Sequence, residues 1–146
     1  MGTRLPYSES KSSNVVVGYA ANANGFGVAY VSTQCGQQSS LLRVPFRVSC
    51  RRVPLDREAG YAAVTAVTRT LAVKGIDPVV VHIEDDCLIE EMHGHREVPA
   101  SLCLSYVRLG CALNGLMGCR LEQVAAGQAA DLTARARAEV HLTVAA

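Results

Sequence analysis

The stretch from 59 to 89 constrains the fold more than any other part of this chain. It has the pattern of a long helix, a tight exit, a short strand and an acidic turn. Apolar residues recur at the spacing of one helical face: Ala59, Ala63, Val64, Val67 and Leu71. Gly75 follows Lys74, a pair that is typical of a helix C-terminus. The sequence therefore predicts a helix over about 56–74.

A predicted strand and three acidic residues follow this helix. Pro78 precedes the run 79–83, which is rich in β-branched residues and too short for an independent helix. Glu84, Asp85 and Asp86 then fall where the strand ends. The carboxyl ends of strands are where open α/β sheets place their ligands. The acidic turn is therefore the first candidate site.

Length and composition limit the class of protein. The chain has 146 residues and a formal net charge of +1. This length suits one domain with a real core, and we expect a flexible tail over 1–13 and a single domain over 14–146. A net charge this small does not by itself favour binding to nucleic acid or to an anionic membrane. We see no membrane span or secretory signal, and we expect a cytoplasmic protein whose six cysteines are mostly small buried hydrophobes.

Three strands are predicted before the long helix, over 14–20, 26–32 and 41–52. Pro45 indicates that the third of these is an edge strand. A short helix (85–93), a second long helix beginning at Pro99, a fifth strand (118–125) and a terminal helix (127–140) follow the fourth strand. One face of the second long helix is apolar: Ala100, Leu104, Val107 and Cys111. Hairpin-linked strands followed by helical crossovers predict an α/β fold with a mixed five-stranded sheet flanked by helices.

This order is similar to the ribonuclease H-like fold, of the ribonuclease HI type. Residues 57–64, Arg-Glu-Ala-Gly-Tyr-Ala-Ala-Val, resemble the start of that family's first helix. Residues 75–94 resemble its helix exit, its fourth strand and the short helix that ends at glycine. Ala129-Ala-Asp-Leu-Thr-Ala resembles its closing helix, and Asn24-Gly-Phe-Gly-Val-Ala resembles the start of its second strand. The resemblance covers the chain from about 14 to 138.

The resemblance implies a metal-dependent hydrolase of the RNA strand in RNA–DNA hybrids. In such enzymes four carboxylates hold two Mg²⁺ ions, which activate water and stabilise the leaving oxygen. The first-strand aspartate falls here at Val17 or Gly18, and the helix glutamate falls at Gly60. Glu58 lies two residues earlier, about 200° around the helix, and is expected to point elsewhere. Glu84 and Asp131 match the other two positions.

Two of the four implied ligands are therefore missing from the aligned positions. The remaining candidate catalytic residues are Glu84 and Asp131, and Glu84, Asp85 and Asp131 form a weak candidate set for one Mg²⁺ or Mn²⁺ ion. The alternative is a solvated acidic turn that caps the next helix. His93 and His95 also have a metal-binding spacing, but no third ligand is evident in the sequence.

Four arginines are candidates for nucleic-acid binding. Arg43, Arg47, Arg51 and Arg52 lie along the third predicted strand. Arginines along a groove can contact phosphates without reading bases. The same charges on an edge strand also discourage pairing between sheet edges. Both interpretations remain open.

The sequence leaves two hypotheses about function. In the first, the chain is a non-catalytic module that binds an RNA–DNA hybrid or other nucleic acid, or assembles with a protein partner or as a homodimer. In the second, it is an active metal-dependent ribonuclease with rearranged ligands: Glu84, Asp131 and one of the neighbouring aspartates.

Overall fold

The computed structural model describes residues 13–35, 37–48, 55–125 and 127–145. Three strands come first: β1 (Ser13–Ala21), β2 (Phe26–Cys35) and β3 (Gln38–Arg47). They are followed by helix α1 (Leu55–Val73), strand β4 (Val79–Ile83), helix α2 (Asp86–Met92), the 3₁₀ turn η2 (Ala100–Leu102) and helix α3 (Cys103–Asn114). Strand β5 (Cys119–Gln123) and helix α4 (Ala130–Ala145) complete the chain.

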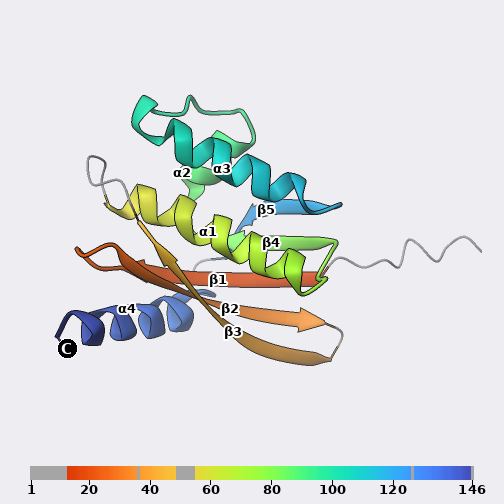
Figure 1. Cartoon of the computed structure of the whole chain (residues 1–146). Helices are drawn as coiled ribbons and strands as arrows, with labels where there is room; N and C mark the ends of the chain where they lie inside the picture. Colours follow the sequence, from red (N-terminus) through yellow and green to blue (C-terminus); the bar gives the residue numbers. More distant parts are fainter. Residues whose placement is uncertain (1–12, 36, 49–54, 126, 146) are drawn as a thin grey trace, which may run out of the picture.

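The five strands form one mixed sheet in the order β3-β2-β1-β4-β5 (Figure 1). β1, β2 and β3 pair antiparallel, whereas β4 pairs parallel with both β1 and β5. Pro45 lies in β3, which is an edge strand as predicted, and an edge strand tolerates the missing amide donor. The predicted α/β fold class and sheet are thus confirmed.

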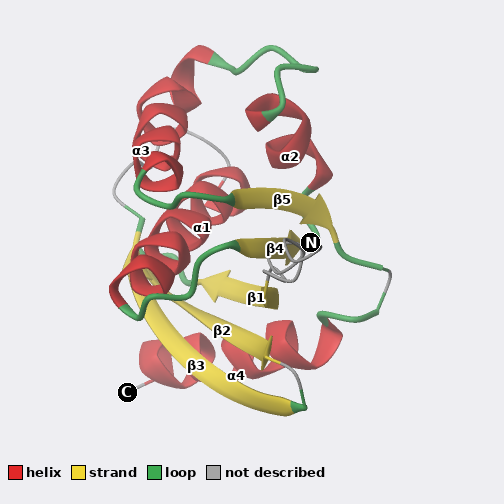
Figure 2. Cartoon of the chain, turned by 90° about the vertical axis from the view of Figure 1, so that its right-hand side faces the viewer, coloured by secondary structure: helices red, strands yellow, loops and turns green. Residues whose placement is uncertain are grey.

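The two faces of the sheet carry different helices. α4 packs alone against β1 and β2, whereas α1 lies across the opposite face and α3 packs on α1 (Figure 2). The main core, between the sheet and α1, includes Val15, Val17 and Leu71, which are all but fully buried. A smaller core joins Val28 of β2 to Ala136 and Val140 of α4. Because successive residues of a strand point to opposite faces, β1 meets α1 with its odd-numbered residues and α4 with its even-numbered ones.

Several details of the sequence prediction need correction. Ser13 belongs to β1, and the rest of the predicted tail lies outside the described residues. The second long helix begins as a 3₁₀ turn, and its buried residues are Leu102 and Leu109. The face predicted from apolar spacing is exposed at Leu104, Val107 and Cys111, because a different stripe of this helix packs on α1.

The cysteine prediction is wrong for α3. Cys103 and Cys111 are exposed, Cys87 and Cys119 are half-buried, and all four are free thiols. Burial raises the pKa of the Cys119 thiol to about 11, which keeps it protonated at neutral pH. The side chains of Cys35 and Cys50 lie outside the described residues. No helix in the described part of the chain has the length and apolar character needed to cross a membrane.

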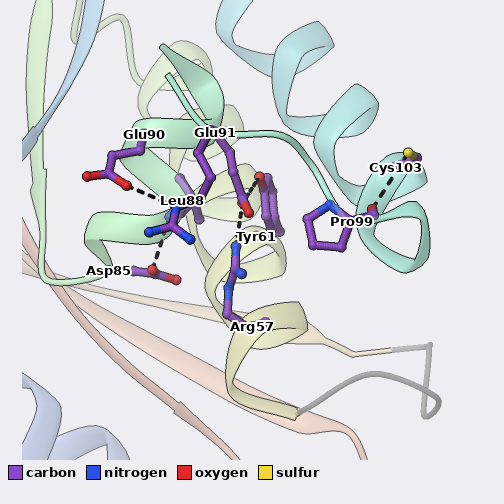
Figure 3. A network of polar contacts seen from close by, with 9 residues as sticks. Arg57, Tyr61, Asp85, Leu88, Glu90, Glu91, Pro99 and Cys103 are labelled. Atoms are coloured by element: carbon purple, nitrogen blue, oxygen red, sulfur yellow. Dashed lines mark hydrogen bonds and ion pairs between the residues drawn. The ribbon is translucent and has the colours of Figure 1, made fainter. Parts of the chain in front are cut away.

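A buried polar network joins α1 to α2 (Figure 3). Glu91 is only 1% exposed and accepts a hydrogen bond from the Tyr61 hydroxyl at 2.7 Å. Arg57 forms an ion pair with the same carboxylate. Burial, reinforced by the Glu91 hydrogen bond, raises the pKa of Tyr61 well above its ordinary value, so the hydroxyl stays a donor. The network fixes α2 against the first turns of α1.

A partly exposed ion pair ties β3 to α4. The Arg43 Nε donates to both carboxylate oxygens of Glu139, at 3.0 and 2.8 Å, and the Tyr30 hydroxyl donates to Oε1. The Arg43 hydrogen bond, with help from Tyr30, lowers the pKa of Glu139. A carboxyl group whose pKa is lower in the folded chain than in the unfolded chain stabilises the fold at pH values above its ordinary pKa. This stabilisation is lost as the pH falls through the lowered pKa.

We therefore expect Glu139→Gln to lower the free energy of unfolding at pH 7 by less than about 1 kcal/mol, because the pair is solvent-screened. The difference from the unsubstituted chain should shrink as pH falls through the lowered pKa of Glu139, because the carboxylate is then protonated. Urea unfolding at pH 7 and at a series of lower pH values measures the difference. A difference that grows on acidification would contradict this assignment.

Candidate functional site

The candidate site lies at the carboxyl end of β4, where Glu84 follows the last residue of the strand. In the parallel pairing of β1 and β4, Val16 lies opposite His82, so two residues further along Gly18 comes level with Glu84. Glu84 is exposed and lines a cleft of about 500 Å³. The end of β1, α1 and α4 form its other walls, which include Val17, Tyr19, Ala59, Thr133, Arg137 and His141.

Gly18 is, with Val17, one of the two positions where the resemblance places a carboxylate, and α4 covers it. A Cβ atom at this residue would stand 2.4 Å from the backbone nitrogen of Thr133 and 2.6 Å from the Cβ of Leu132. Both neighbours belong to the backbone or stem of the helix and cannot rotate away. A side chain of any kind at position 18 therefore requires α4 to move off the sheet.

Gly60 occupies the position of the helix glutamate, and its surroundings are already polar. A Cβ atom there would stand 2.9 Å from both the Asp85 Oδ2 and the Tyr19 hydroxyl oxygen. Glu58 points away from this site, as expected from helical geometry. It is 5% exposed, and its Oε2 accepts a hydrogen bond from Ser105 of α3 at 2.7 Å. Asp85 and Tyr19 thus lie where the missing side chain would extend.

The remaining acidic residues have local roles in the structure. Asp85 is the N-cap of α2, and its Oδ1 accepts a hydrogen bond from the Leu88 amide at 3.1 Å. Asp131 is exposed in the first turn of α4, where a negative charge is favourable. The capping alternative weighed for the acidic turn in the sequence is thus seen at Asp85.

The structure brings one set of potential metal ligands close together. Within the described ranges, the one group of three potential ligands that lies close together is Asp85, Asp86 and Cys87. A thiol is a poor ligand for Mg²⁺, which prefers hard oxygen donors, so this set does not suit that ion. Glu84 and Asp131 belong to no such group within those ranges. His93 and His95 are exposed, with ring centroids 6.0 Å apart, and no third ligand joins them among the residues described.

The four candidate arginines differ in what the structure shows of their surroundings. Arg43 is held by Glu139, so its guanidinium already has an anionic partner. Arg47 is exposed and lines a second, smaller cleft. Arg51 and Arg52 lie outside the described residues. Among the described residues, Arg47 is thus the candidate that is exposed and takes part in no ion pair.

Sequence reasoning overlooked the basic side of the first cleft. Thr133, Arg137 and His141 are spaced four residues apart on α4 and line the cleft together with Glu84. The i, i+4, i+8 spacing was visible in the sequence, but nothing there indicated that this stripe of the helix faces the end of β1. A hydroxyl, a guanidinium and an imidazole offer hydrogen-bond donors to an anionic ligand.

The chain matches no protein-family model and no curated protein sequence. Its fold is nevertheless that of solved ribonucleases H. RNase H1 from the halophilic archaeon Halobacterium salinarum shares 15% identity, with a TM-score of 0.71 over 91% of this chain and 99% of that one. The N-terminal RNase H domain of rv2228c from Mycobacterium tuberculosis shares 17% identity, with a TM-score of 0.59 over 92% and 100%.

A third solved structure is LC11-RNase H1 in complex with an RNA/DNA hybrid. It shares 12% identity with this chain, with a TM-score of 0.63 over 89% of this chain and 99% of that one. At these identities the likeness establishes the fold alone. The chain therefore has a ribonuclease H-like fold, as its residues indicated.

Proposed function

We propose that this chain is a ribonuclease H-like domain that binds RNA–DNA hybrid or related nucleic acid without two-metal hydrolysis. The observation that carries the proposal is at the two positions where the resemblance places a central metal ligand: α4 leaves no room for a carboxylate at Gly18, and Val17 is an apolar residue that is 1% exposed. Gly60 adds a second position without a side chain, and Glu58, the nearest acid along the sequence of α1, accepts a hydrogen bond from Ser105 instead.

The first cleft supports binding without metal. In a two-metal site the ions neutralise the phosphate charge. Here Arg137 and His141 place fixed donors beside Glu84 in the same cleft. Such side chains bind backbone phosphates without base specificity. The solved complex of LC11-RNase H1 with a hybrid makes the hybrid the first nucleic acid to test.

The second candidate function is an active ribonuclease with rearranged ligands. Glu84 and Asp131 keep a carboxylate at the two positions that the resemblance assigns to aspartates, and Asp85 lies beside the position of the missing helix glutamate. Mg²⁺ or Mn²⁺ would be held by these acids. Because fewer acids mean weaker affinity for Mg²⁺, we favour the non-catalytic proposal.

A gel-shift and cleavage experiment on one labelled RNA–DNA hybrid separates the two. We expect the hybrid to shift in EDTA, and the RNA strand to stay intact in about 10 mM Mg²⁺ or Mn²⁺. Affinity should fall steeply with salt, because phosphate contacts release counterions. Asp131→Ala should leave binding unchanged or slightly stronger, since it removes a negative charge. Metal-dependent cleavage that Asp131→Ala abolishes would establish the active enzyme instead.

Failure of both binding and cleavage would remove nucleic acid as the partner. The proposal would then reduce to a protein-assembly role, with a protein partner or a homodimer. Light scattering on the isolated chain tests the homodimer directly.

A further inference from the structure

A second cleft opens where the end of β3 meets α1 and α3. It encloses about 230 Å³ and shares no lining residue with the cleft at Glu84. Small-molecule sites usually enclose roughly 300–1,000 Å³, so this cleft suits a compact group and not a whole nucleoside. Its walls include the apolar stems of Phe46, Ala62 and Ala66.

Three arginines from three different elements line this cleft. Arg47 comes from β3, Arg69 from α1 and Arg108 from α3, and all three side chains are exposed. None of them takes part in an ion pair within the described residues. Like charges around one small cleft repel one another unless a counter-charge is present. The cleft is therefore built with a surplus of positive charge.

One acid, Glu58, also lines the cleft and does not cancel this surplus. Its Oε2 accepts the Ser105 hydrogen bond, while its buried Oε1 has no hydrogen-bond partner among the residues described. The carboxylate lies on the buried side of the cleft, at 5% exposure, and pairs with none of the arginines. Counting three arginines against one glutamate leaves a formal charge of about +2 in the cleft.

We propose that this arginine cleft binds a phosphate group carried on a nucleic-acid strand. The guanidinium of arginine presents a planar set of hydrogen-bond donors that matches the oxygens of a phosphate. Three guanidiniums from three different elements line a cleft whose volume and positive charge suit one phosphate group. The inference depends on the proposed nucleic-acid binding for the source of the phosphate. The site itself depends only on the arginines, and the three of them act together.

The first test uses inorganic pyrophosphate alone, titrated into the ¹⁵N-labelled chain and followed by NMR. We expect the largest shifts at the side chains and amides of Arg47, Arg69 and Arg108. Arg69→Gln and Arg108→Gln should each weaken binding about tenfold, which corresponds to one charge-assisted contact. Arg120→Gln, an exposed arginine on β5 outside the cleft, is the matched control and should change little.

The second test repeats these variants with the RNA–DNA hybrid. Arg69→Gln and Arg108→Gln should each weaken hybrid binding. They should also make the plot of log K against log salt concentration less steep, by up to about 0.9 for each phosphate contact that is lost. Glu58→Gln keeps the acceptor for Ser105 but removes the opposing charge, so it should strengthen binding several-fold. A purely structural role for Glu58 would change stability and leave the affinity as it was.

The outcomes separate this inference from the proposed function. Hybrid binding with unchanged affinity and salt slope in both arginine variants would overturn the cleft and leave the proposed function standing. Pyrophosphate binding at the arginines without any hybrid binding would overturn the nucleic-acid source and point to a small phosphorylated compound. Failure of the unsubstituted chain to bind pyrophosphate would overturn the site itself.

Discussion

Gly18→Ala should lower the free energy of unfolding by about 3 kcal/mol, one of the largest effects expected from adding a single methyl group to this chain. The new Cβ would stand 2.4 Å from the Thr133 backbone nitrogen and 2.6 Å from the Leu132 Cβ. Neither atom can move without moving α4, which buries Val28, Ala136 and Val140 between the helix and the sheet. Urea unfolding followed by circular dichroism measures the loss.

Gly60→Ala is the matched control. Its Cβ would meet the ends of three side chains: the Asp85 Oδ2 and the Tyr19 hydroxyl oxygen, both at 2.9 Å, and the Leu88 Cδ1 at 3.6 Å. Alanine is also a better helix former than glycine by about 1 kcal/mol, which offsets the crowding. We expect this variant to stay within about 1 kcal/mol of the unsubstituted chain. Equal stability of the two variants would contradict the tight packing of α4 on Gly18.

The second large effect concerns the ion pair between α1 and α2. Arg57→Ala should lower the free energy of unfolding by about 3–5 kcal/mol, because Glu91 would remain buried without a cation. The Tyr61 hydroxyl would be its one remaining partner among those described, at 2.7 Å. One hydrogen bond cannot replace the attraction of a guanidinium at a site that is 1% exposed.

A second substitution tests this explanation. Glu91→Gln in the Arg57→Ala chain removes the stranded charge and should recover a large part of the stability. The double-mutant cycle isolates the coupling between the two side chains. If the two substitutions instead destabilise the chain additively, the destabilisation in Arg57→Ala comes from packing of the arginine stem and the buried ion pair contributes little.

The sequence predicted the order of the elements well because their physical signals are local. Helical spacing from Ala59 to Leu71 and the β-branched run before Glu84 predicted α1 and β4 to within one or two residues. Pro45 marked an edge strand for the same reason, since a missing amide donor has a direct consequence for pairing. The turn after β4 was also placed correctly, and the capping role weighed for its acidic residues is seen at Asp85.

Packing between segments that are distant in the chain could not be predicted from the sequence. The apolar spacing of Leu104, Val107 and Cys111 resembled a buried face, yet a neighbouring stripe of α3 packs on α1 and leaves these residues exposed. The arginine cleft could not be foreseen because Arg47, Arg69 and Arg108 are far apart in the chain and meet only in the fold. The tight contact of Gly18 with α4 likewise depends on two segments that are distant in the chain.

A crystal of this chain soaked in Mn²⁺, with anomalous scattering recorded at the manganese edge, tests the central claim most directly. We predict no pair of ions at the carboxyl end of β4, because Val17, Gly18 and Gly60 have no carboxylate where the resemblance places two of the four ligands. Two ions about 3.5–4 Å apart, bound by Glu84 and Asp131, would contradict this prediction.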